Sequence, residues 1–302
     1  MKNTKVFFLG KNDRSIMKNL IIGGCTNYGI NQLKPWVLSI KETMPDADTD
    51  KVMCVGNAST TTREWLVENG FKLVNMPTMN VPIHVLRFLS IYDYLKEHWQ
   101  EYEYVVTTDV KDVYFQKNPF DWLTVLDNTA TKLIAGSEGM LYKDEPWGND
   151  NLMQAYGPYV HELNKNNKIY NVGTIGGKSE YVKDLVFNIF TNAIHRPIAI
   201  CDQAVYNVLI QTQPYKSITF FAEQSHAWAC QAGTTVDPSK INHFRPFLTE
   251  KEPIFEDGLV KTYAGSIFHI VHQYDRVPEW KKFVQEKYEQ EDESQFFTYR
   301  TT

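Results

Sequence analysis

Two carboxylates stand close together where an apolar run of the chain ends. The segment VVTTDVKDVYFQKNPF, residues 105–120, begins as a β-like run and then carries Asp109 and Asp112 before a Pro-Phe pair. Carboxylate oxygens are hard ligands that suit a divalent cation, which commonly keeps coordination places for waters or phosphates. An aspartate directly after a strand can instead cap the following turn through backbone N–H groups. The segment therefore indicates a cation site, with turn capping as the alternative.

A glycine-rich strand in the second half of the chain carries one conspicuous amide. The stretch YNVGTIGGKSEYV, residues 170–182, contains Asn171 with Gly173, Gly176 and Gly177. Glycines in a strand allow a ligand to approach the backbone closely, and they also occur in bulged strands and turns. The pattern thus predicts a strand that lies beside a ligand or that merely bends.

Two further motifs bring acid–base and metal-binding side chains. Asp202 and Gln203 open a predicted helix in AICDQAVYNVLIQ, where an aspartate either caps the helix or faces a ligand. His269 and His272 follow a Gly-bearing turn in GSIFHIVHQYDRVPEW, and a histidine there either ligates a metal or lies in the core.

The elements that must position these groups alternate between strands and helices. Strands are expected in KNLIIGGCTN, DKVMCVG, FKLVNM and YEYVVTTD, with amphipathic helices between them at 29–45, 60–70 and 83–99. This alternation is typical of an α/β layer structure. Ligands of such folds bind beyond the carboxyl ends of the strands, which is where Asp109 stands.

Composition limits the classes of function. The 302 residues are 43% hydrophobic and carry a net charge of −5, which fits a globular protein and disfavours nucleic acid as a partner. The four cysteines show no CxxC spacing, so a zinc knuckle or disulfide scaffold is not expected. The apolar run at residues 6–10 is too short for a signal segment, and no stretch is long enough for an integral membrane segment. We therefore expect a cytoplasmic protein.

The order of these motifs resembles that of GT-A nucleotide-sugar glycosyltransferases, especially retaining families related to glycogenin and bacterial galactosyltransferases. The shared landmarks are a carboxylate pair, Asn-x-Gly, Asp-Gln and a histidine eight residues before Trp280. The segment DVYFQKNPF is also similar to the DVVWxRxPF run that follows the metal motif in related families. The resemblance extends from about Asn19 to Trp280.

The resemblance implies a GT-A (Rossmann-like) α/β fold with a mixed central sheet flanked by helices. A single domain over residues 1–302 is expected, with a nucleotide-sugar-binding half at about 19–125. The acceptor and catalytic half would cover about 126–280, and residues 281–302 would form a C-terminal helix and tail.

The resemblance also implies a Mn²⁺ or Mg²⁺ site. The resembled families carry Asp-x-Asp, whereas two residues separate Asp109 from Asp112 here. Spacing to the Pro-Phe pair matches Asp112 to the second carboxylate, and Asp109 can supply the other, so either or both are metal ligands. His272 completes the site through its spacing to Trp280, with His269 in reserve.

Donor and catalytic residues follow from the same resemblance. The expected donor-binding residues are Thr26, Asn27 and Tyr28 near the base and ribose, Arg87 and Asp109 near the diphosphate or sugar, Asn171 and Gly173 beside the sugar, and Gly176 and Gly177 behind it. Asp202 would stabilise the oxocarbenium-like centre or act as a transient nucleophile, and Gln203 would orient Asp202 or the sugar. This arrangement implies retention of configuration.

Two aperiodic segments are candidates for the acceptor site. GSEGMLYKDEPWGND (136–150) and AEQSHAWACQAGTTVDP (222–238) are rich in polar and aromatic residues. Trp147 or Trp228 could stack on a pyranose face, and Glu138 and His226 are their candidate polar groups, but ordered surface loops would read the same way.

The expected function is metal-dependent transfer of a sugar from a nucleoside diphosphate sugar, with UDP as the commonest nucleotide in the resembled families, to a glycan or other hydroxyl acceptor. A sugar nucleotidyltransferase is a second possibility, but it would normally show a basic Gly-rich loop after its first strand, and GGCTNYG has no basic residue. A non-enzymatic carbohydrate-binding protein on a decayed transferase scaffold is a third.

Overall fold

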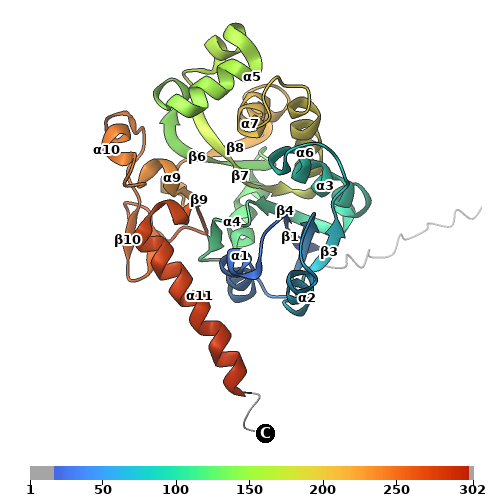
Figure 1. Cartoon of the computed structure of the whole chain (residues 1–302). Helices are drawn as coiled ribbons and strands as arrows, with labels where there is room; N and C mark the ends of the chain where they lie inside the picture. Colours follow the sequence, from blue (N-terminus) through green and yellow to red (C-terminus); the bar gives the residue numbers. More distant parts are fainter. Residues whose placement is uncertain (1–16, 299–302) are drawn as a thin grey trace, which may run out of the picture.

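The structure, a computed structural model, describes residues 17–298, and the side chains of residues 17–288 (Figure 1). The apolar run at residues 6–10 lies outside this range. Within it, a seven-stranded sheet has the order β3-β2-β1-β4-β7-β6-β8. Its strands are β1 (Lys18–Cys25), β2 (Thr49–Val55), β3 (Lys72–Asn75), β4 (Tyr102–Thr108), β6 (Leu133–Leu141), β7 (Lys168–Lys178) and β8 (Thr219–Ala222).

The sheet is mixed. Strands β3, β2, β1 and β4 run parallel, β7 is antiparallel to both β4 and β6, and β6 is parallel to β8. The parallel strands end at the same edge because helical crossovers return the chain to the opposite edge each time. The predicted α/β class, with a mixed central sheet flanked by helices, is confirmed.

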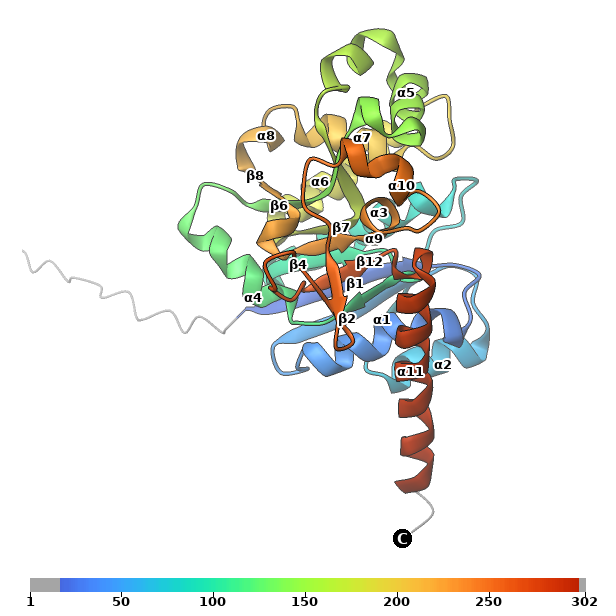
Figure 2. The same ribbon diagram turned by 90° about the vertical axis from the view of Figure 1, so that its left-hand side faces the viewer.

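Helices cover both faces of the sheet, with α1 and α2 on one side and α3 and α6 on the other (Figure 2). The main helices are α1 (Ile30–Thr43), α2 (Thr60–Glu68), α3 (Ile83–His98), α4 (Pro119–Leu123), α5 (Pro146–Asn164), α6 (Ser179–Ala193), α7 (Asp202–Ile210) and α8 (Tyr215–Ile218). Helix α1 buries Leu33, Trp36, Val37 and Ile40 against the sheet, as its apolar spacing predicts. On the opposite face, the apolar sides of α3 and α6 join one continuous core.

A smaller sheet lies beside the carboxyl ends of the parallel strands. It has the order β5-β12-β9 and consists of β5 (Val113–Phe115), β12 (Ile270–His272) and β9 (Ala229–Gln231). A hairpin of β10 (Ile254–Glu256) and β11 (Leu259–Lys261) and the helices α9 (Ala232–Thr235), α10 (Ile241–Phe244) and α11 (Pro278–Thr298) complete the described chain. Helix α11 extends beyond the other elements (Figures 1 and 2).

Short 3₁₀ helices join several of these elements: Trp99–Glu101, Thr124–Asn128, Tyr142–Asp144, Gln224–His226, Arg245–Phe247 and Tyr274–Arg276. Between residues 17 and 298, no helix has both the length and the apolar character needed to cross a membrane.

Candidate active site

The two sheets bring Asp109, Asp112 and His272 together. Asp109 follows the last residue of β4, Asp112 precedes β5, and His272 ends β12. Because β12 pairs antiparallel with β5, His272 lies opposite Val113, the neighbour of Asp112. The Nε2 atom of His272 is 3.4 Å from Oδ2 of Asp109 and 3.5 Å from Oδ1 of Asp112. Strand pairing thus brings His272 close in space to two aspartates that are far from it in the sequence.

The geometry of this cluster fits a divalent cation. Each side chain offers one ligand atom, and these atoms all lie within 4.8 Å of one another. Neighbouring ligands of an octahedral Mg²⁺, which sit about 2.1 Å from the ion, are about 3 Å apart, and the distances of 3.4 and 3.5 Å from His272 to the two aspartates are slightly longer. A Cβ atom at position 173 would lie 2.7 Å from Cε1 of His272 and 3.0 Å from Oδ2 of Asp109, so Gly173 keeps this space open. The donor set of two carboxylates and one imidazole suits Mn²⁺ or Mg²⁺.

Gln231 fixes the orientation of the His272 ring. Its Oε1 atom lies 2.8 Å from Nδ1 of His272, and its Nε2 atom donates to Oγ1 of Thr174 at 3.0 Å. In this arrangement Nδ1 is the donor nitrogen, so the lone pair of Nε2 faces the two aspartates. A metal-binding histidine usually has such a partner on its second nitrogen.

Arg87 is a buried cation between two carboxylates. Its guanidinium group forms ion pairs with Asp109 and, at 3.3 Å from Nη2 to Oδ2, with Asp202. Burial lowers the pKa of Arg87, while Asp202 and Asp112 oppose that shift. Burial alone would raise the pKa of Asp112, but His272 and Arg276 hold it below the usual aspartate range. The cationic side chains of Arg87 and Arg276 therefore offset part of the negative charge of the aspartates here.

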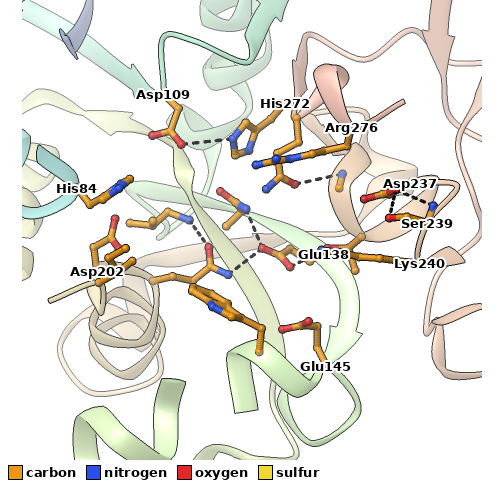
Figure 3. A pocket seen from close by; sticks show the side chains of 18 of the residues that line it. His84, Asp109, Glu138, Glu145, Asp202, Asp237, Ser239, Lys240, His272 and Arg276 are labelled. Carbon is orange, nitrogen blue, oxygen red and sulfur yellow. Dashed lines mark hydrogen bonds and ion pairs between the residues drawn. The ribbon is translucent and has the colours of Figure 1, made fainter. Parts of the chain in front are cut away.

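The cluster opens into a large pocket of about 840 Å³ (Figure 3). Asp109 and His272 lie on one side of it, Glu145 lies on the opposite side, and Glu138 lies between them. A smaller pocket of about 240 Å³ adjoins it and shares Arg87, Asp109 and His272 with it. Both pockets therefore border the candidate metal site.

The predicted catalytic residues and Asn171 line the large pocket. Asn171 and Gln203 both donate to Oε1 of Glu138, at 2.7 and 2.9 Å. Burial, together with the charge of Glu145, raises the pKa of Glu138, while hydrogen bonds from its donors oppose the shift. Glu138 and Trp147, two predicted acceptor residues, also line this pocket, and Trp147 is 55% exposed.

The capping alternatives do not describe these aspartates. Helix α7 has Cys201 at its N-cap position and lacks a side-chain cap, while Asp202 is its first residue and pairs with Arg87. The carboxylate of Asp109 also pairs with Arg87, and its backbone N–H donates to the Gly173 carbonyl at 3.0 Å.

The loop after β1 is only partly available to a ligand. Tyr28 lines the smaller pocket. The Thr26 hydroxyl accepts from the backbone N–H of Asn57, and Oδ1 of Asn27 accepts from Nδ2 of Asn57. Thr26 lines a separate pocket of about 530 Å³ near the ends of β2 and β3. These hydrogen bonds connect the loop after β1 to the loop after β2. Thr26 and Asn27 therefore stabilise the contact between the two loops.

Several predicted site residues lie away from the large pocket. A Cβ atom at Gly176 would lie 2.9 Å from the Trp228 ring, and one at Gly177 would lie 2.3 Å from the Lys132 carbonyl oxygen. These two glycines therefore allow close packing inside the sheet rather than room behind a sugar. The fully buried Trp228 packs edge-on against Trp122, so it cannot stack on an acceptor in this structure.

Two further histidines, the acceptor candidate His226 and the reserve metal ligand His269, are also engaged elsewhere. His226 is exposed and packs edge-on against Phe220, and its Nδ1 accepts from the backbone N–H of Glu223. It does not line the large pocket. His269 bonds through Nδ1 to the Asn118 carbonyl at 2.7 Å and is not part of the Asp109–Asp112–His272 cluster.

Sequence reasoning missed several pocket residues. His84 stands three residues before Arg87 on α3, a spacing that places both on one helix face, so it could have been found. Arg276 could also have been found, because it is a cationic residue only four positions after the predicted metal ligand His272. Glu145, Gln231 and Lys240 had no comparable signal because only the fold brings them near the site.

Comparison with known proteins gives little beyond this geometry. No protein-family profile matches the chain, and no curated protein matches it by sequence. Among solved structures, the galactosyltransferase LgtC in complex with donor and acceptor sugar analogues matches 84% of this chain and 86% of its own. The identity is 14% and the TM-score is 0.48. At that level the match assigns no activity, and a functional proposal must depend on the chain's own side chains.

Proposed function

We propose that this protein is a metal-dependent glycosyltransferase that moves a sugar from a nucleoside diphosphate sugar to a hydroxyl group of a glycan. The observation that carries the proposal is the Asp109–Asp112–His272 cluster, which lies at the carboxyl edge of the parallel strands and opens into a polar pocket. Ligand sites of α/β sheets occur at this edge. The proposed nucleotide is UDP, on the resemblance of the sequence motifs.

The nucleotide and the sugar occupy the two adjoining pockets. The smaller pocket, which contains Tyr28, takes the nucleoside, and the larger one takes the sugar and the acceptor. A divalent cation held by Asp109, Asp112 and His272 would stabilise the charge that develops on the diphosphate as it leaves. Arg276 lines both pockets and supplies a second positive charge for the phosphates.

The proposed stereochemistry is retention. Asp202 and Gln203 stand at the start of α7 and line the sugar pocket, where Asp202 faces the anomeric carbon from below and stabilises positive charge on it. Arg87 holds Asp202 in place through their ion pair. The leaving phosphate then accepts the proton of the acceptor hydroxyl on the opposite face, so a separate base is unnecessary.

Trp147 and Lys240 support a glycan acceptor. Both line the large pocket, and the exposed indole of Trp147 offers a flat apolar face on which a pyranose can stack. Lys240, which lies near Asp237 and Ser239 (Figure 3), would donate hydrogen bonds to acceptor hydroxyl groups.

The test is release of UDP from UDP-galactose or UDP-glucose with Mn²⁺, measured by chromatography with and without a panel of oligosaccharide acceptors. Acceptor-stimulated release supports the transferase, while tight donor binding with no release supports a non-enzymatic binding protein. Formation of a nucleotide sugar from UTP and a sugar phosphate would instead identify a nucleotidyltransferase. Proton NMR of the first product tests retention, because an α-linked donor must then give an α-linked product.

A further inference from the structure

Glu138 is the centre of a hydrogen-bond network in the large pocket. It belongs to β6, is 5% exposed, and contacts residues of three other elements. Its Oε1 accepts from Nδ2 of Asn171 on β7 and from Nε2 of Gln203 on α7, and its Oε2 accepts from the Thr234 hydroxyl on α9 at 3.0 Å. A single carboxylate therefore joins the two amide side chains that were assigned above to the donor sugar.

A carboxylate decides which way an amide faces. The two ends of an amide are nearly equal in size, but one only donates and the other only accepts, while an ionised carboxylate only accepts. Glu138 thus holds the NH₂ groups of Asn171 and Gln203. Their oxygens turn to the backbone, where Oδ1 of Asn171 accepts from Gly173 at 2.7 Å and Oε1 of Gln203 accepts from Val172 at 3.5 Å.

The network leaves hydrogen-bond donors unused. Each NH₂ group has two N–H bonds, and one of them is directed to Glu138. Among residues 17–288, neither amide nitrogen has a second acceptor. Both side chains line the pocket, so two N–H donors remain for a ligand there. Asn171 is buried and Gln203 is half-buried, and buried polar groups are normally satisfied, which indicates that a ligand or water supplies the missing acceptors.

We propose that Glu138 is a positioning residue that turns Asn171 and Gln203 so that both present N–H donors to oxygen atoms of the donor sugar. The inference rests on the proposed function, and it changes the role predicted for Glu138 from acceptor binding to control of the donor site. The selected ligand is a sugar ring with hydroxyl or ring oxygens that accept hydrogen bonds at these two positions.

Two substitutions separate positioning from acid–base chemistry. In Glu138→Gln the amide oxygen can still accept from Asn171 and Gln203, and its NH₂ can donate to Thr234, because a hydroxyl both donates and accepts. In Glu138→Met both amides lose the acceptor that orients them. A base or nucleophile would be lost in both variants, whereas a positioning acceptor survives in the glutamine variant.

The first measurement is calorimetry with Mn²⁺, comparing UDP with UDP-galactose and UDP-glucose. The affinity gained from the sugar should fall about tenfold in Glu138→Met and stay within about threefold of wild type in Glu138→Gln, while the affinity for UDP itself changes little in either. An unchanged sugar increment in Glu138→Met overturns the proposal. Equal loss in both variants also overturns it, since that would show a need for the charge or proton of Glu138.

The second measurement does not need a nucleotide. In protein labelled with ¹⁵N at Asn and Gln side chains, the NH₂ signals of Asn171 and Gln203, assigned with Asn171→Ala and Gln203→Ala, should shift and exchange faster in Glu138→Met than in Glu138→Gln. Equal signals in the two variants overturn the positioning role. If wild-type protein binds neither UDP nor UDP-sugars, the proposed function fails, and these spectra still decide whether Glu138 orients the amides.

Discussion

Two carboxylate clusters border the large pocket, and they differ in what balances their charge. At the Asp109–Asp112–His272 cluster the partners are charged or chargeable groups, Arg87 and His272. At Glu138 the partners are three neutral donors, Asn171, Gln203 and Thr234. The first cluster places two aspartates close together, which favours binding of a cation. At the second, hydrogen bonds to Glu138 orient the neighbouring side chains.

This difference indicates that the two clusters have different roles. The Glu138 carboxylate already accepts three hydrogen bonds from neutral donors, so it gains less from a cation. Asp109, Asp112 and His272 instead offer three ligand atoms that lie within 4.8 Å of one another. Binding of a metal is therefore expected at one cluster and not at the other.

The largest expected effect is at Asp112. Asp112→Asn removes one anionic ligand, and we expect metal-supported turnover to fall by a factor on the order of 100 or more, with Mn²⁺ no longer raising the melting temperature. Turnover assays and thermal unfolding with and without Mn²⁺ measure both. The matched control is Asp121→Asn, an exposed aspartate in α4 that should change neither quantity. Wild-type turnover in Asp112→Asn would remove the distinction between the two clusters.

The next largest effect is expected on UDP binding when divalent cations are removed. Removal of divalent cations with EDTA should weaken UDP binding by about tenfold or more, because Asp109 and Asp112 then face the diphosphate as like charges. Titration calorimetry with and without EDTA measures this change. Uridine, which has no phosphates, is the control ligand and should bind equally in both conditions. Equal affinity of UDP in both conditions would contradict the metal assignment.

A smaller effect is expected at Gln231, which contacts the predicted metal ligand His272. Gln231→Leu removes the acceptor of the His272 Nδ1 proton, so the imidazole can change tautomer and turn, and the affinity for Mn²⁺ should fall about 10- to 100-fold. Electron paramagnetic resonance of free Mn²⁺ gives this affinity without turnover. Gln224→Leu is the matched control, since Gln224 is also buried but its amide contacts none of the cluster residues. The same loss in both variants would point to general destabilisation.

Much of the fold and of the candidate site could be predicted from the sequence. The predictions that the structure does not support have physical reasons. The period of apolar residues and the Gly turns placed the first strands and helices, and the end of β4 located Asp109 and Asp112. The segment 222–238 was misread because its polar residues are used inside the protein, where Gln231 supports His272 and Thr234 supports Glu138. The segment 136–150 shows no alternation in sequence because Gly136 to Leu141 belong to the buried strand β6, while the candidates Glu138 and Trp147 do line the pocket. No local pattern reveals that a polar side chain faces another buried one.

The aromatic residues of those two segments show the same limit. Trp147 and Trp228 looked alike in the sequence, each among polar and small neighbours, yet one is 55% exposed and the other is fully buried. Burial here depends on Gly176, which lies on a distant strand and leaves room for the Trp228 ring. The pairing of strands decides which tryptophan a ligand can reach.

The smallest expected effect is at the mouth of the pocket, on the Glu138 side. Trp147→Ala removes the exposed ring that is proposed to stack on the acceptor, so the KM for a glycan acceptor should rise about 3- to 10-fold, with kcat and the affinity for UDP nearly unchanged. Steady-state kinetics at saturating donor separate these constants. Tyr159→Ala is the matched control, since Tyr159 lies on the same helix α5, is 77% exposed and does not line the pocket. An equal change in both variants would mean that α5 acts through its stability, whereas a fall in kcat for Trp147→Ala alone would place Trp147 nearer the reacting sugar than the pocket mouth.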